Sequence, residues 1–114
     1  MKIIYTKSFD KTFKKLKKHH KELGNFNKII YYLDSVSSFG DLKNDSYIKT
    51  LYNFERLKYN NSNYYSFNLS KHSGVIRLIV EEVANDIAFV YISVNHYKDV
   101  SVGKVIYYGK EEIK

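Results

Sequence analysis

The sequence predicts a single α+β domain, in which an N-terminal strand and a two-helix hairpin pack on a mainly antiparallel β-sheet. Apolar residues recur at helical spacing between residues 9 and 36, whereas short β-branched and aromatic segments bounded by turn residues follow residue 63. The 114 residues are 44% apolar and 17% aromatic, which is sufficient for one hydrophobic core. Residues 1–100 form the predicted core and residues 101–114 a C-terminal extension.

The first third of the chain predicts a strand followed by two helices. Residues 2–6, "KIIYT", have strand composition, and Ser8 is the expected N-cap of the first helix. Gly24 is expected to end that helix and Asn25 to cap the second. The apolar stripes consist of Phe9, Phe13, Leu16 and Leu23 in the first helix and of Phe26, Ile29, Ile30, Leu33 and Val36 in the second.

The remaining elements are strands. Residues 37–45, "SSFGDLKND", break the helical pattern, and residues 46–58 are ambiguous between a short helix and an extended segment, with an extended backbone favoured from Asn53 to Lys58. We expect an antiparallel meander, with the helix pair on one face. Its strands are Tyr64–Leu69, Val75–Val83 and Ile87–Val94. The tail after Val100 is compatible with a strand, a helix or disorder.

The register of the last hairpin has two solutions. If Ala84 pairs with Ile87 around a two-residue turn, Arg77 faces Val94. A shift by one residue instead matches the apolar residues of the two strands, so that Leu78 faces Ile92. In both registers Arg77 and His96 lie at the same edge of the sheet, where a bulge could realign them.

The positive charge is concentrated at the N-terminus. Residues 1–28 contain nine lysines against Asp10 and Glu22, and this excess of seven equals the net charge of the whole chain. A cationic surface attracts polyanions and speeds encounter with them, so Lys14 and Lys18 on the first helix are candidate RNA-binding residues. A solvated lysine-rich helix face is the structural alternative.

Several functional classes are excluded or disfavoured. The absence of cysteine excludes disulfides, thiolate metal sites and a cysteine nucleophile. The longest apolar stretch is far shorter than the run of about 20 residues that a membrane span needs, and the N-terminus lacks a signal-peptide pattern, so a cytoplasmic protein without membrane contact is expected. His19 and His20 diverge on a helix, and neither a metal site nor a cofactor is predicted.

Four residues from distant parts of the chain can meet at one edge of the sheet: Glu55, Arg77, His96 and Tyr97. RNA cleavage without a metal needs a base for the 2'-hydroxyl proton, a cation for the charge on the phosphorane and an acid for the departing 5'-oxygen. Glutamate, arginine and histidine supply these functions. The structural alternatives are an ion pair of Arg77 with Glu55, Glu81 or Glu82, and a surface pair of Glu55 with Lys58 or Arg56.

The order of these segments resembles that of the RelE/ParE superfamily of bacterial toxins, and most closely the RelE and YoeB-like mRNA interferases. Members carry a Glu-x-Leu-Lys segment, aromatic residues that open a strand, an Arg-Leu strand and a closing His-Tyr pair. Here these are residues 55–58, Tyr64 with Tyr65, Arg77 with Leu78, and His96 with Tyr97.

The resemblance implies the RelE-like fold and a ribosome-dependent endoribonuclease that cuts mRNA in the 30S A site, inhibited by a cognate antitoxin protein. Carried over by position, Glu55 is the general base, Arg77 the transition-state stabiliser and His96 the general acid. Tyr97 stacks on or orients a base, and Lys58 contacts phosphate. Tyr65 is a further candidate RNA contact, although tyrosines opening a strand more often pack in the core or at its rim.

The chain departs from the relatives at Phe67 and Asn68, where they have basic residues, and in its tail after Val100. Two other functions are compatible with the same scaffold. One is a non-catalytic inhibitor of DNA gyrase, as in the ParE branch. The other is a basic RNA- or ribosome-binding module that presents tyrosines for stacking without cleavage.

Overall fold

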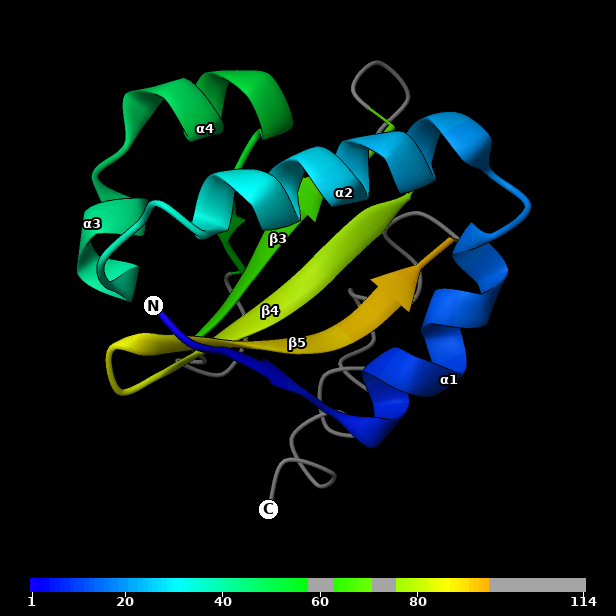
Figure 1. Cartoon of the computed structure of the whole chain (residues 1–114), viewed down its shortest axis with the longest axis horizontal. Coiled ribbons are helices and arrows are strands. Elements are labelled where there is room, and N and C mark those ends of the chain that lie inside the picture. Colours follow the sequence, from blue (N-terminus) through cyan, green and yellow to red (C-terminus); the bar gives the residue numbers. More distant parts are fainter. Residues whose placement is uncertain (58–62, 71–75, 95–114) are drawn as a thin grey trace.

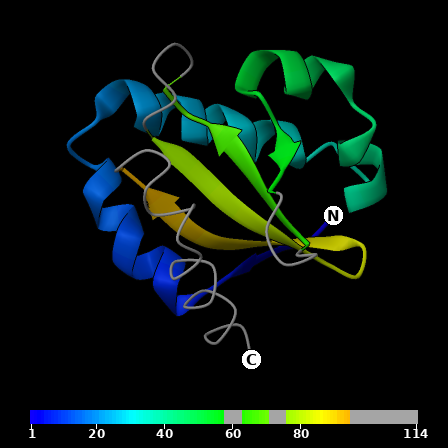
Figure 2. The ribbon, with the colours of Figure 1, turned by 180° about the vertical axis from the view of Figure 1, so that it is seen from behind.

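The computed structural model of the chain describes residues 1–57, 63–70 and 76–94, and within them a five-stranded sheet of order β1-β5-β4-β3-β2. The strands are β1 (Ile3–Tyr5), β2 (Glu55–Arg56), β3 (Tyr64–Asn68), β4 (Arg77–Val83) and β5 (Asp86–Ser93). Strands β2 to β5 form the predicted antiparallel meander, and β1 pairs parallel with β5 (Figures 1 and 2).

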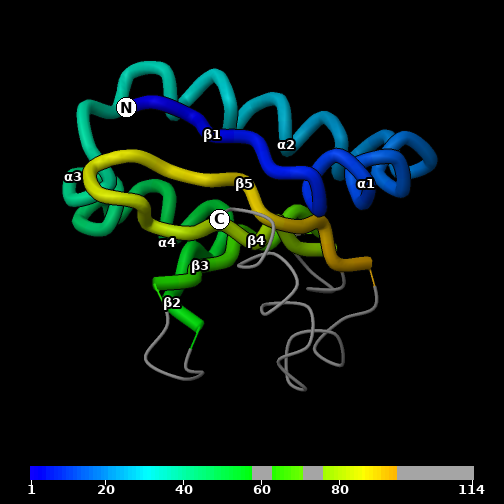
Figure 3. The backbone as a smooth tube through the Cα atoms, turned by 90° about the horizontal axis from the view of Figure 1, so that it is seen from below, coloured from blue at the N-terminus to red at the C-terminus, as the bar shows by residue number. Residues whose placement is uncertain are grey.

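Four helices lie between β1 and β2: α1 (Lys7–Leu16), α2 (His20–Leu33), α3 (Phe39–Lys43) and α4 (Ser46–Tyr52). All four place buried side chains in one core cluster with residues of the sheet. Seen along the layers, α2 runs on one side of the strands (Figure 3). No helix within the described residues is long and apolar enough to cross a membrane.

The helix pair is confirmed, but its predicted boundaries are wrong. Thr6, not Ser8, caps α1, because the Thr6 hydroxyl accepts from the N–H of Phe9. The chain turns at residues 17–19, so Gly24 lies inside α2 with open space around it. Asn25 caps no helix; its side-chain amide donates to the carbonyl of Leu69 at 2.7 Å and so ties α2 to the end of β3.

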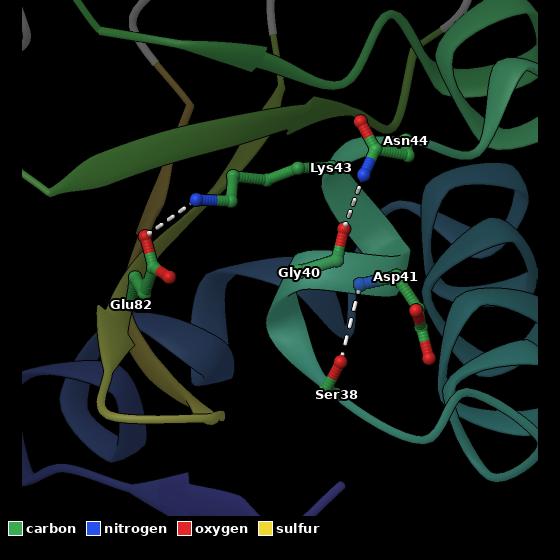
Figure 4. A network of polar contacts seen from close by, with 6 residues as sticks. All are labelled: Ser38, Gly40, Asp41, Lys43, Asn44 and Glu82. Atoms are coloured by element: carbon green, nitrogen blue, oxygen red, sulfur yellow. Dashed lines mark hydrogen bonds and ion pairs between the residues drawn. The ribbon is translucent and has the colours of Figure 1, made fainter.

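Residues 37–45 and 46–52, predicted as a break and an ambiguous segment, form two short capped helices. Ser38 caps α3, and the carboxylate of Asp45 accepts from two backbone N–H groups of α4 (Figure 4 shows the α3 contacts). The Tyr32 hydroxyl also donates to Asp45, which lowers the pKa of that carboxyl. Helix α4 then ends at Asn53, whose φ of 46° is the left-handed conformation that turns the chain into β2.

The two faces of the sheet are buried in different clusters. The main core lies between the sheet and the helices, and Leu78, Phe67 and Phe89 are among the strand residues in it. A smaller cluster lies on the opposite face, which we call the second face, and no described helix contributes a buried residue to it. Its buried members are Leu57, Tyr64, Ile79, Ala88 and Val90. Side chains of odd-numbered β4 residues, including Arg77, therefore point to the second face.

A bulge sets the register of the last hairpin. Arg77 pairs with Ser93 and Leu78 with Ile92, whereas beyond the shift at Ile79/Val80 the pairing is Val80 with Phe89. The register that places Arg77 opposite Val94 is thus wrong, and the apolar-matched register holds only at the Arg77 end. Val90 is the extra residue, so Val90 and Tyr91 both lie on the second face.

Hydroxyl groups of α1 and its N-cap bond to the backbone of β5 beyond Phe89, where the pairing with β1 ends. Thr6 donates to the carbonyl of Phe89 at 2.9 Å, and Ser8 donates to the carbonyl of Val90 at 2.5 Å. One turn further along, the Thr12 hydroxyl accepts from the N–H of Ile92 at 2.8 Å. These bonds explain why three hydroxyl residues are buried on a lysine-rich helix.

Thr12→Val should therefore destabilise the fold by about 1–3 kcal/mol, because the buried N–H of Ile92 loses its acceptor. The measurement is urea unfolding followed by circular dichroism. Thr50→Val is the matched control, since the Thr50 hydroxyl also donates to the carbonyl four residues earlier in its helix, but its side chain is exposed to solvent. Equal effects of the two substitutions would contradict the role given to the buried Thr12 hydroxyl.

Candidate functional site

Glu55 is positioned by the edge strand β2. The left-handed Asn53 ends α4 and directs the chain along β3, where Glu55 pairs with Ser66 and Arg56 with Tyr65. The side chains of a strand alternate, so Glu55 shares the second face with Ser66, and Arg56 shares the helix side with Tyr65. The Glu55 side chain is 46% exposed.

Arg77 is the first residue of the central strand β4. It pairs with Asn68 of β3 on one side and with Ser93 of β5 on the other, and its side chain is only 4% exposed. An unpaired charge at such a position costs several kcal/mol. The position therefore requires anionic or polar groups around the guanidinium.

Two such groups come from neighbouring strands. Nη1 of Arg77 lies 3.8 Å from Oε1 of Glu55 and 3.5 Å from the hydroxyl oxygen of Ser66. Ser66 is fully buried. It pairs with Glu55 of β2, and it lies two residues before Asn68, the β3 residue that pairs with Arg77, so its side chain lies on the same face as those of Glu55 and Arg77. The guanidinium thus lies against a half-exposed carboxylate, an arrangement that can also bind a phosphate oxygen.

Comparison with known proteins is informative at the level of structure. No family model and no curated protein sequence matches the chain. YafQ from E. coli strain BL21(DE3) superposes with a TM-score of 0.59 at 17% identity, over 82% of this chain and 91% of YafQ. The S. aureus YoeB dimer gives a TM-score of 0.58 at 18% identity, over 84% of this chain and 98% of YoeB.

This chain has the RelE-like toxin fold. YafQ in the E. coli DinJ-YafQ toxin-antitoxin complex gives the same TM-score of 0.59 at 15% identity, over 82% of this chain and 90% of that one. The predicted fold class is confirmed, including the mainly antiparallel five-stranded sheet. Sequence identities this low establish the architecture, and function has to be argued from the residues of this chain.

The RelE-like fold brings together two of the predicted catalytic residues, Glu55 and Arg77. His96, Tyr97 and Lys58 lie outside the described residues. Ser66 was not predicted from the sequence. All five residues of β3 are buried, so the strand has no alternation that would distinguish a site serine from a packing serine.

Tyr65 lies on the helix side of the sheet, not on the second face. It is 8% exposed, and its ring stacks on Phe54 at 5.3 Å between centroids and meets Phe39 edge-on at 5.0 Å. These are the contacts of a core residue, which was the alternative to an RNA contact for Tyr65. Its remaining exposed surface lines a pocket beside Glu55.

The lysines of α1 lie toward the β1 edge of the sheet, which is opposite to the β2 edge. Lys14 on α1 and Lys18 in the following turn are both exposed. Helix α1 packs along β5, and the ammonium of Lys15 lies 6.0 Å from the ring centre of Tyr91, which belongs to the second face. Helix α1 therefore places positive charge along the border of the face that carries Arg77.

The second face also buries a phenol. Tyr64 pairs with Glu81 across β3 and β4, and its hydroxyl has no hydrogen-bond partner within the described part of the chain. Burial, followed by the charge of Glu81, raises the pKa of Tyr64 above its ordinary value. A buried hydroxyl without a partner lowers stability and keeps the phenol protonated.

Glu55→Gln should lower the free energy of unfolding by about 1–3 kcal/mol, because the buried guanidinium of Arg77 loses an anionic partner but keeps the Ser66 hydroxyl and gains an amide oxygen in place of the carboxylate. Urea unfolding of the variant and the wild type measures this difference. An unchanged free energy of unfolding would show that Glu55 does not compensate the buried charge of Arg77.

Tyr64→Phe should raise the free energy of unfolding by about 1 kcal/mol, because it removes a buried hydroxyl without a partner. In the wild type, the pKa of Tyr64 is higher in the folded than in the unfolded chain. Below pH 10 the phenol is protonated in both states and the free energy of unfolding does not depend on it, whereas above pH 10 only the unfolded phenol ionises and the free energy of unfolding falls. Unfolding measured from pH 8 to 11 should thus show a shallower alkaline decline in Tyr64→Phe. Tyr31→Phe, at an exposed position, is the control and should leave both quantities unchanged.

Proposed function

We propose that the protein is the toxin of a type II toxin-antitoxin system, and that it acts as a metal-independent, ribosome-dependent endoribonuclease on mRNA in the A site. The observation that supports this most is the buried guanidinium of Arg77 beside the half-exposed carboxylate of Glu55. The pair combines a fixed cation with a base that solvent and substrate can reach. The RelE-like fold adds support, because YafQ and YoeB share it.

In the proposed reaction, Glu55 takes the proton of the 2'-hydroxyl, and the resulting oxygen attacks the adjacent phosphorus. The bond from phosphorus to the 5'-oxygen breaks as His96 protonates that oxygen, and Arg77 stabilises the charge on the phosphorane. The products are a 2',3'-cyclic phosphate and a 5'-hydroxyl. DNA lacks the 2'-hydroxyl and is not a substrate.

The remaining predicted residues bind and orient the RNA. Tyr97 holds a base beside the cleaved bond, and Lys58 contacts phosphate. Lys14 and Lys18 belong to the basic segment, whose charge attracts RNA over a longer range. No metal or cofactor takes part in this mechanism.

A cognate antitoxin protein is the second proposed partner. The support is the structure of YafQ in a toxin-antitoxin complex with DinJ, whose toxin has the fold of this chain. Binding of an antitoxin to the free toxin provides a measure of correct folding that does not depend on catalysis.

Arg77→Ala and His96→Gln should each reduce mRNA cleavage at least 100-fold, because each removes a group that acts in the transition state. The measurement is induction in cells followed by mapping of 5'-hydroxyl mRNA ends by codon position. Antitoxin binding should be retained by both variants. Cleavage by either variant at the wild-type rate would show that the assignment is wrong.

The same experiment separates the alternatives. Cuts in phase with codons support the nuclease. DNA breaks that depend on gyrase would indicate a ParE-like inhibitor, and growth arrest with neither kind of break would indicate a basic RNA- or ribosome-binding module.

A further inference from the structure

A pocket of about 400 Å³ lies at the β2 edge of the sheet, on the helix side of Glu55. Its lining residues come from α3, α4, β2 and β3, and three of the six carry positive charge. They are Lys43, Lys49, Phe54, Glu55, Arg56 and Tyr65. A volume of this size is in the range of small-ligand sites.

The apolar wall of the pocket is rigid. The rings of Phe54 and Tyr65 are stacked with 12° between their planes, and both rings pack against Phe39. Phe54 and Tyr65 are almost completely buried, so only a small part of each residue is open to a ligand. The wall therefore suits a flat or sugar-like group lying against it, not a base inserted between rings.

The three cations have different surroundings. The ammonium of Lys43 lies 3.4 Å from Glu82 on β4, an ion pair that ties α3 to the sheet (Figure 4). Lys49 on α4 and Arg56 on β2 are both exposed and line the pocket from the two sides of the chain turn at Asn53. These two residues give the pocket a positive potential at its solvent side.

Glu55 connects this pocket to the candidate site. Its carboxylate lies 3.8 Å from Arg77, and Glu55 also lines the pocket, whereas Arg56, the next residue of β2, points to the other face. Strand β2 is the last strand of the described sheet. Glu55, on this edge strand, is therefore common to the ion pair with Arg77 and to the pocket that Lys49 and Arg56 line.

We propose that the pocket is an RNA subsite that binds the sugar and phosphate of a nucleotide next to the cleaved phosphodiester, with Lys49 and Arg56 as the phosphate-binding groups. The inference rests on the proposed function and extends it to residues outside the catalytic set. An acidic protein segment is the other kind of anionic partner. We argue for RNA because the pocket shares Glu55 with the site where the phosphodiester is cleaved.

The test uses the full chain and an RNA oligonucleotide with a 2'-deoxy sugar at the cleaved position, which binds without reacting. Lys49→Gln and Arg56→Gln should each raise the Kd about 3- to 10-fold, and should reduce the dependence of log Kd on log salt by about 0.7 for each phosphate that the variant no longer binds. Lys2→Gln is the matched control, because it removes one positive charge of the basic N-terminal segment, beside β1 at the opposite edge of the sheet, and so measures the long-range effect of a lost charge without the loss of a pocket contact. It should have a smaller effect on both quantities.

Shortening the oligonucleotide identifies the nucleotide that the pocket binds. Removing the nucleotides on one side of the cleaved bond should weaken binding to the wild type but not further weaken binding to Lys49→Gln, because the variant already lacks the group that binds them. Thermal unfolding confirms that each variant is folded.

The outcomes separate the subsite from the proposed function. If the wild type cleaves mRNA while Lys49→Gln and Arg56→Gln bind RNA as Lys2→Gln does, the subsite is wrong and the nuclease stands. If the variants lose antitoxin binding and keep RNA affinity, the pocket binds protein and the inference is overturned. If the wild type neither binds the oligonucleotide nor cleaves mRNA in cells, both proposals fail.

Discussion

The burial of one guanidinium constrains the architecture of the sheet. Arg77 begins a central strand with its side chain almost completely covered, and an isolated charge there would cost several kcal/mol. The carboxylate and the hydroxyl that reduce this cost come from β2 and β3. The pairing of Glu55 with Ser66 places both groups on the side of the sheet to which Arg77 points. A strand of only two residues therefore contributes an anionic group to the environment of the charge.

The bulge in β5 determines how the two faces of the sheet are used. Without the bulge, regular alternation from Phe89 would point Tyr91 to the helix side and would point Ile92, a main-core residue, to the second face. With the bulge, Val90 and Tyr91 both point to the second face and Ile92 stays in the main core, while the carbonyl of Val90 and the N–H of Ile92 bond to hydroxyls of α1. The lysines of the same helix remain exposed. One helix thus stabilises the bulge with its buried side and carries positive charge on its other side.

The sequence predicted the elements that have a sustained apolar pattern, and it did not predict the element boundaries that depend on a few contacts. The strands and the meander follow from β-branched segments between turns, and both are confirmed. The end of α1 was misplaced because Gly24 suggests a stop, whereas the real signal is the absence of apolar residues between Leu16 and Leu23. Helix α3 was missed and α4 was left as one of two alternatives for residues 46–58, because both helices are one or two turns long and depend on their caps. The hairpin register could not be derived, since a bulge has no fixed sequence signature.

Two residues of the candidate site, Arg77 and Glu55, were identified from the sequence. Arg77 is conspicuous as a charge among apolar strand residues, which requires an anion, and Glu55 follows from the order of segments. Ser66 carries no such signal, because every residue of its strand is buried. The pocket at the β2 edge was equally invisible in the sequence, because it is assembled from α3, α4 and β2, and of the two helices α3 was not predicted and α4 was only one of two alternatives.

The unequal exposure of the ion pair bears on how such a site could work. Arg77 is fixed by its surroundings, whereas the side chain of Glu55 is nearly half-exposed and can move into solvent when another anion takes its place beside the guanidinium. In the proposed reaction an incoming phosphate replaces the carboxylate as the partner of the guanidinium. Glu55 is then released as a base beside the 2'-hydroxyl, and Ser66, which carries no charge, continues to hold Arg77 when Glu55 becomes protonated. The same pair thereby compensates the buried charge before RNA binds and separates into its two catalytic functions afterwards.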